Sequence, residues 1–181
     1  DLTLPIKSGL SSSAAICVLV ARAFNLLYNL NLNTLGEMNI AYLGELRTSS
    51  RCGRLDQACA FGVKPNLMTF DGDEIEVRSL NVRKHLFCVF ADLCAEKDTI
   101  KILSDLNKAY PFPTTEAERA EHEALGQQNL DIVDRAIKYM AEGDAEALGR
   151  LMTEAEALFD AKVAPMSPAL ISPKLHRVLN R

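Results

Sequence analysis

The first strong hydrophobic pattern of the chain is an almost uninterrupted apolar run over residues 14–28, broken mainly by Arg22 and Asn25. Such a run predicts a helix over residues 13–28 that is apolar on nearly every side and is therefore central and buried. The short apolar segment 2–6 in front of it predicts a strand. The chain thus begins as a strand, a loop and a buried helix.

Apolar residues at helical spacing predict a second helix that starts at Thr34 and ends near Arg47. Thr34 is the expected N-cap, and Glu37 three residues later completes the pattern of a capping box. Glu45 falls on the edge of the apolar stripe, where a carboxylate is either a border residue at the surface or a placed ligand. The pattern by itself favours the border residue. The stripe consists of Leu35, Met38, Tyr42 and Leu46.

Two short strands over residues 66–70 and 75–80 are expected to form a hairpin, because the Asp71-Gly72 pair between them is a strong turn signal. The apolar run over residues 86–93 is the strongest strand pattern of the chain. Its central residues are apolar on both faces, which predicts an interior strand.

The rest of the chain is predicted to be helical. Asp98 starts one helix, and Thr115 with Glu118 has the pattern of a capping box that starts a long one. Gly143 ends this long helix, and Asp144 caps the next. Strands and helices in this order predict an α+β fold. The predicted helices span residues 98–106, 115–142, 145–161 and 173–179.

The composition changes this picture little: of 181 residues, 48% are hydrophobic and 24% are charged, as in an ordinary soluble globular protein. This length allows one moderate domain or two small layers. The net charge of -4 argues against a general role at nucleic acids or membrane surfaces. We therefore expect neither as a partner.

The five cysteines form no Cys-x-x-Cys pair and are odd in number, which argues against a zinc site or a disulfide framework. Cys17 and Cys88 lie in apolar runs and are predicted to be buried thiols. Free thiols suit a reducing cytoplasm, and no secretion signal is visible at the start of the sequence. We therefore expect a cytoplasmic protein.

The loop in front of the first helix is the leading candidate for chemistry. Gly9 and three consecutive serines precede the apolar run, so backbone amides at a helix N-terminus are available to bind an anion. The alternative is a serine-capped helix after a turn, and the spacing by itself leaves the two even. The loop is neither a Walker loop nor the Gly-x-Gly-x-x-Gly pattern.

Residues 5–15, with their Gly-Leu-Ser-Ser-Ser-Ala-Ala core, resemble the second motif of the GHMP kinases, the superfamily of galactokinase, homoserine kinase and mevalonate kinase. The resemblance implies that this loop wraps the phosphates of ATP. Lys7 either reaches a phosphate or lies on the surface. The implied ATP-binding residues are Lys7, Ser8, Gly9, Leu10, Ser11, Ser12, Ser13 and Ala14.

Asp56 is the second candidate. A carboxylate among small and apolar residues either caps a short helix or acts as a partly desolvated acid, and Arg51 and Arg54 are possible charge partners. Residues 51–57 resemble the Lys-Cys-Gly-Ile-Met-Asp-Gln segment of galactokinases. The resemblance implies that Asp56 is the catalytic, substrate-facing acid and that Gly53 lines the sugar pocket.

The resemblance also implies a magnesium site. In the mevalonate kinase branch, the last serine of the phosphate motif and a helix glutamate bind Mg²⁺, and those positions hold Ser13 and Glu45 here. Hydroxyl and carboxylate oxygens are suitable ligands for this hard cation. The resemblance therefore changes the expectation for Glu45 from a border residue to a ligand. The acidic run over residues 116–123, by contrast, is interpreted as a solvated helix face.

The resemblance further implies a two-layer GHMP kinase fold. Its N-terminal part, residues 1–84, is like a domain of ribosomal protein S5, and its C-terminal part, residues 85–181, is ferredoxin-like. The implied function is the ATP-dependent phosphorylation of a monosaccharide hydroxyl. The alternatives are a non-catalytic sensor or regulator of the same fold and an inactive fragment, since segments of a GHMP kinase are expected before residue 1 and after residue 181. The histidines, His85, His122 and His176, lack the spacing of a hydrolase site.

Overall fold

The computed structural model describes residues 9–48, 52–94 and 98–179. They fall into two compact units, Asp1–Val77 and Arg78–Arg181, which are described separately below. The expected strand over residues 2–6 lies outside the described residues. The expected domain boundary between residues 84 and 85 stays a prediction.

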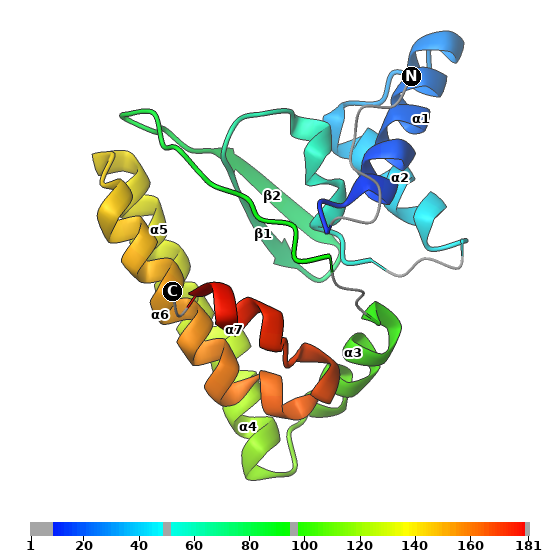
Figure 1. The fold of residues 1–181 in the computed structure, drawn as a ribbon. Helices are drawn as coiled ribbons and strands as arrows, with labels where there is room; N and C mark the ends of the chain where they lie inside the picture. Colours follow the sequence, from blue (N-terminus) through cyan, green and yellow to red (C-terminus); the bar gives the residue numbers. More distant parts are fainter. Residues whose placement is uncertain (1–8, 49–51, 95–97, 180–181) are drawn as a thin grey trace. The chain divides into compact units, whose positions relative to one another are not determined.

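The first unit is built on two helices and a hairpin (Figure 1). Helix α1 (Ser12–Tyr28) packs against α2 (Thr34–Glu45), and the short 3-10 helix η1 (Asp56–Phe61) packs against both. Strands β1 (Asn66–Asp71) and β2 (Glu74–Ser79) form a two-stranded sheet. Both helices and the hairpin are confirmed where the hydrophobic pattern predicted them.

The core of the first unit is small. Small side chains on α1 let α2 and η1 approach closely, and Met38 fills the space between them. The prediction that α1 is buried on nearly every side is wrong: only Ala14, Val18 and Ala21 of this helix are buried. In the described chain its other faces expose Ile16, Leu19, Val20, Phe24, Leu26 and Leu27.

The start of α2 also differs from the prediction. Asn33, not Thr34, is the N-cap, and its side chain accepts a hydrogen bond from the Gly36 amide at 2.8 Å. The predicted capping box is therefore wrong. Glu37 lies instead on the buried face of the helix together with Glu45, because residues eight positions apart return to the same side. The pattern-based view of Glu45 as a border residue is wrong as well, since its side chain is only 1% exposed.

The second unit is mainly helical, and its predicted caps are confirmed. The side chains of Asp98, Thr115 and Asp144 each accept a hydrogen bond from the first turn of a helix, and Gly143 ends α5 with a φ of 70°. The long predicted helix is interrupted at Gly126, whose backbone is not helical. The elements are α3 (Thr99–Leu106), η2 (Asn107–Ala109), α4 (Glu116–Glu123), the π-helix η3 (Ala124–Gln128), α5 (Asn129–Glu142), α6 (Ala145–Lys162), η4 (Ala164–Met166), η5 (Pro168–Leu170) and α7 (Pro173–Leu179).

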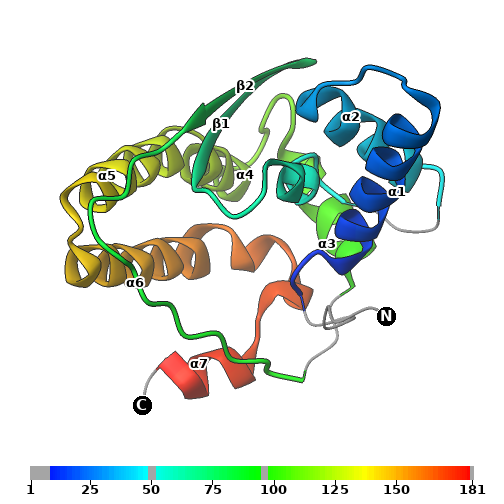
Figure 2. The ribbon, with the colours of Figure 1, turned by 90° about the horizontal axis from the view of Figure 1, so that it is seen from above.

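Helices α5 and α6 lie side by side as an antiparallel pair (Figures 1 and 2). Residues 86–93 run as an extended segment without strand pairing, so the prediction of an interior strand there is wrong. The side chains of Phe87, Val89 and Phe90 are exposed. Within the described residues the sheet of β1 and β2 is the only one, and a ferredoxin-like arrangement is not shown.

All five cysteines are free thiols. Cys17 is half-buried, whereas Cys88 is exposed, so the prediction of a buried thiol is wrong for Cys88. In the part of the chain that the structure describes, no helix combines the length and the apolar character needed to cross a membrane.

Candidate active site

The start of α1 leaves backbone donors available. The first intrahelical bond runs from the Ala15 amide to the Ser11 carbonyl at 3.0 Å, so the amides of Ser12, Ser13 and Ala14 have no acceptor within the helix. Ser11 adopts a left-handed backbone conformation, with a φ of 52°, and its side chain does not cap these amides. In the described part of the chain α1 thus has an uncapped N-terminus, the kind of position that binds anions.

The predicted ATP-binding residues differ in their surroundings. Gly9 has a φ of +75° and open space around it, which favours glycine at this position. Ser13 is exposed, whereas the Ala14 side chain is fully buried and leaves only its backbone for a ligand. Lys7 and Ser8 lie outside the described residues. The roles of these residues stay predictions.

The side chains of Ser11 and Asp56 meet. The Ser11 hydroxyl donates a hydrogen bond to Asp56 Oδ1, although the two residues are 45 positions apart in the sequence. This contact brings the end of the serine loop to the start of η1. A ligand anion at the start of α1 would therefore lie near a carboxylate.

Gly53 holds the other oxygen of Asp56. Its backbone amide donates to Asp56 Oδ2 at 3.0 Å, and Gly53 itself is exposed. Asp56 is half-buried at the first position of η1. The structure thus brings together the predicted catalytic and substrate-binding residues.

Glu45 lies next to this group, at the end of α2. Its Oε2 accepts a hydrogen bond of 2.8 Å from Nε2 of Gln57, the residue that follows Asp56. Gln57 is fully buried, and its Nε2 also lies 3.3 Å from Cys52 Sγ. Burial raises the pKa of the Cys52 thiol to about 11, and the charge of Glu45 contributes to the rise. Cys52 is therefore a protonated thiol at neutral pH.

An ion pair between half-exposed Arg22 and buried Glu37 fixes the helices that carry the site. Arg22 of α1 donates to Glu37 Oε2 of α2 and to the Ala60 carbonyl of η1, both at 2.8 Å. The Asn25 amide donates to Glu37 Oε1 at 2.8 Å. Burial raises the pKa of Glu37, but the hydrogen bonds from Asn25 and Arg22 outweigh it and hold this pKa below its usual range. One network thus joins α1, α2 and η1.

Arg54 was expected as a charge partner of Asp56, and this expectation is wrong. Its guanidinium donates to the carbonyls of Gly72 and Asp73 in the hairpin turn, and it lies 5.8 Å from the centre of the Tyr42 ring. Arg54 therefore ties the hairpin to the helices. Arg51, the other expected partner, lies outside the described residues.

Sequence reasoning missed two contacts of the site. Ser11 was expected to bind phosphate, not to donate to Asp56, and no local pattern reports a contact across 45 residues. Gln57 ends the galactokinase-like segment of residues 51–57, but the resemblance implied no role for it. Its position beside Asp56 was the available signal, since a polar residue in a segment that packs against two helices needs a hydrogen-bond partner.

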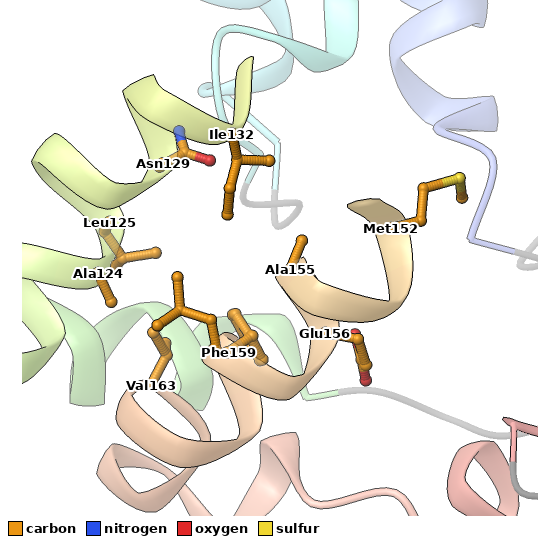
Figure 3. Close-up of a pocket in the computed structure, with 10 residues that line it drawn as sticks. Ala124, Leu125, Asn129, Ile132, Met152, Ala155, Glu156, Phe159 and Val163 are labelled. Carbon is orange, nitrogen blue, oxygen red and sulfur yellow. The ribbon is translucent and has the colours of Figure 1, made fainter. Parts of the chain in front are cut away.

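The second unit contains a pocket of about 340 Å³ between η3, α5 and α6. Its walls are largely apolar, with Ile132 of α5 and Phe159 of α6 bordering the space (Figure 3). The polar side chains at its wall are Asn129 and Glu156. None of the predicted site residues lines this pocket.

Comparison with known proteins places these observations in a family context. Residues 1–63 match the family model described as the GHMP kinases N terminal domain. The structure of L. major mevalonate kinase in complex with R-mevalonate is similar to this one, with a TM-score of 0.69 and 22% sequence identity. The similarity covers 89% of this chain and 48% of that one, so the chain spans about half the length of the structure it matches. The chain thus has the α+β fold of a GHMP-type kinase, and its first 63 residues match the N-terminal domain of that superfamily.

Proposed function

We propose that this chain belongs to an ATP-dependent kinase that phosphorylates a hydroxyl group of a small molecule. The hydrogen bond between Ser11 and Asp56 carries the proposal, because it joins the free N-terminus of α1 to a carboxylate. Phosphoryl transfer depends on positioning and charge stabilisation, and it needs donors around the phosphates beside a group that orients the acceptor hydroxyl. The match of residues 1–63 to GHMP kinases supports the same reaction.

The backbone amides of Ser12, Ser13 and Ala14 would bind the phosphates of ATP, with the positive end of the α1 dipole behind them. The exposed Ser13 hydroxyl and the Glu45 carboxylate are the oxygen donors that would hold Mg²⁺. Two protein oxygens suit a cation whose other ligands are water and phosphate. When bound, Mg²⁺ would neutralise negative charge on the transferring phosphoryl group.

Asp56 would accept the hydrogen bond of the acceptor hydroxyl in place of Ser11. The hydroxyl oxygen forms a bond to the γ-phosphorus, the bond from the γ-phosphorus to the β-γ bridging oxygen breaks, and ADP leaves. The hydroxyl proton passes to Asp56 or to the phosphoryl oxygens, and in both cases the Asp56 carboxylate orients the attacking group. The Gly53 amide keeps that carboxylate in place.

For the substrate, we propose a monosaccharide. The sequence pattern Cys52-Gly53-x-x-Asp56-Gln57 supports this, since it resembles galactokinases more than the mevalonate branch. The solved neighbour holds R-mevalonate, which makes mevalonate the first competing acceptor to test. A cytoplasmic location is part of the proposal and is supported by five free thiols.

For the second half, we propose the ferredoxin-like arrangement expected from the resemblance, with a domain boundary near residue 84. The division of the chain into two compact units at residues 77 and 78 supports a boundary in this region.

The test is ADP release by the full-length protein with Mg-ATP and a panel of monosaccharides, mevalonate and homoserine. Turnover with one sugar supports both the reaction and the substrate class. Turnover with mevalonate or homoserine supports the kinase and overturns the sugar. Sugar or nucleotide binding without any turnover supports the sensor instead of the kinase.

A further inference from the structure

We propose that Gln57 is a positioning residue that fixes the Glu45 carboxylate for its cation and links it to Asp56. The inference rests on the proposed kinase function. Gln57 directly follows Asp56 and is fully buried, and its Nε2 donates to Glu45 Oε2 at 2.8 Å. One side chain thus connects the predicted metal ligand on α2 to the segment that carries the predicted catalytic acid.

The chemistry of the pair determines how the Gln57 amide is turned. An ionised carboxylate only accepts hydrogen bonds, so the NH₂ group of Gln57 faces Glu45. The same nitrogen lies 3.3 Å from Cys52 Sγ, so both of its N–H groups have an acceptor. The orientation of the amide is therefore fixed by two contacts.

This orientation leaves the other end of the amide without a partner. Gln57 Oε1 is buried and accepts no hydrogen bond from the described residues. A buried carbonyl oxygen without a donor destabilises the folded state, so stability by itself does not explain an amide here. The bond to Glu45 gives it a reason, because an apolar side chain of equal size would fill the space but could not donate a hydrogen bond to the carboxylate.

Glu37 provides the contrast within the same helix. Its carboxylate is bonded by the Arg22 guanidinium, which supplies a positive charge. Gln57 is neutral, so its bond orients Glu45 without adding positive charge. A neutral donor to a metal-binding carboxylate fixes its direction, and loss of such an outer partner typically weakens metal binding roughly 10- to 100-fold.

The experiment measures the Mg²⁺ dependence of ADP binding to the full-length protein by calorimetry, with EDTA as the metal-free reference. Gln57→Met keeps the side-chain volume and removes the amide. We expect it to raise the Mg²⁺ concentration at half-effect by roughly 10-fold or more, with ADP binding in EDTA unchanged. Glu45→Gln should act in the same direction.

The double variant separates positioning from packing. If Gln57 acts through Glu45, then Gln57→Met has no further effect on the Mg²⁺ midpoint in a Glu45→Gln background. Glu37→Gln is the matched control: it alters the other buried carboxylate of α2 and should lower thermal stability while leaving the midpoint unchanged. Gln57→Asn, whose amide is one methylene too short to reach Glu45, replaces Gln57→Met if that variant does not fold.

An unchanged midpoint in the Gln57 variant, or an equal shift with and without Glu45, overturns the positioning role and leaves the kinase proposal intact. Wild-type protein that binds ADP equally well with and without Mg²⁺, or not at all, contradicts both. A midpoint shift that disappears in the Glu45→Gln background supports the inference.

Discussion

The Ser11 hydroxyl donates a hydrogen bond to the Asp56 carboxylate, and this contact joins the N-terminus of α1 to the N-terminus of η1. A helix N-terminus attracts an anion, whereas a carboxylate repels one. Phosphoryl transfer needs both groups: the helix N-terminus holds the phosphates, and the carboxylate orients the acceptor hydroxyl. The contact therefore has the composition expected of a site where a phosphoryl group meets an alcohol.

If the proposed kinase function holds, Asp56→Asn should lower the turnover number of the full-length protein by roughly 100- to 10,000-fold, the usual contribution of a positioned acid or base. The amide keeps the shape of the side chain and can still accept from Gly53, so nucleotide binding should stay within about twofold. ADP release and calorimetry with Mg-ADP measure the two quantities. Wild-type turnover in this variant would contradict the catalytic role of Asp56 and would leave it as a residue at the start of a short helix.

Gly53→Ala tests whether Gly53 lines the acceptor pocket. An added Cβ would lie 3.8 Å from Asp56 Oδ2, an ordinary contact, so the fold should tolerate it. One extra carbon in a fitted pocket typically costs 10-fold or more in kcat/KM, so we expect roughly that loss for the acceptor and none for ATP. Gly44→Ala on α2, where a Cβ meets nothing within 4 Å, is the matched control. Equal acceptor kinetics in both variants would exclude Gly53 from the pocket.

Arg22→Met should destabilise the first unit by about 1–3 kcal/mol, because it leaves the buried Glu37 carboxylate without its cationic donor. Arg22 is 41% exposed on its side chain, so solvent screens part of the effect. Arg150→Met removes an exposed pair with Glu146 and should cost less than about 0.5 kcal/mol. Urea unfolding measures both.

The same pair predicts a pH dependence. The folded-state pKa of Glu37 is lowered, so its contribution to stability is present above the unfolded pKa of about 4.3 and is lost as pH falls through the lower folded value. Glu37→Gln should remove this part of the acid sensitivity. Identical acid unfolding of the variant and the wild type would contradict the assignment.

The pKa of Glu121, in the second unit, is shifted in the opposite direction to that of Glu37. The Glu121 side chain is fully buried, and neither carboxylate oxygen has a hydrogen-bond partner among the described residues, which corrects the interpretation of residues 116–123 as a solvated face. Burial and then the charge of Glu118 raise its pKa, while the charge of His122 lowers it. The contribution of Glu121 to stability is therefore most favourable below the unfolded pKa of about 4.3, and it falls as pH rises through the raised folded value.

Glu121→Met should accordingly stabilise the protein at pH 8 by about 1–3 kcal/mol, because it removes a buried, unsatisfied acid. The gain should shrink toward pH 4. Glu142→Met, an exposed position on α5, should change stability by less than about 0.5 kcal/mol at both pH values. Denaturant unfolding at pH 4 and pH 8 measures the difference, and a loss of stability in Glu121→Met at pH 8 would contradict the account.

The local features of the fold could be predicted from the sequence because each depends on a few adjacent residues. The Asp71-Gly72 turn, the capping box of Thr115 and Glu118 and the terminating Gly143 are of this kind. Non-local features could not. The apolar run 86–93 has the pattern of a strand, but a strand forms only where a partner strand lies beside it. In the described chain this segment has no such partner.

In the candidate site, too, some features could be predicted from the sequence and others could not. Resemblance to a family motif predicted roles for Asp56, Gly53 and the serine loop, and the structure places Ser11 and Gly53 against Asp56. Helical spacing misplaced Glu45, because the apolar stripe was centred on large side chains, whereas the buried face of α2 includes the smaller Ala41.

The most direct test of the central claim is transfer of a labelled γ-phosphoryl group. The full-length protein is incubated with Mg²⁺, γ-labelled ATP and each acceptor of the panel, and the acceptor is analysed by mass spectrometry. We predict one phosphorylated acceptor, formed in equal amount to ADP, and its loss in Asp56→Asn. If the label stays in ATP or appears only as inorganic phosphate with every acceptor, the result contradicts the proposed kinase function.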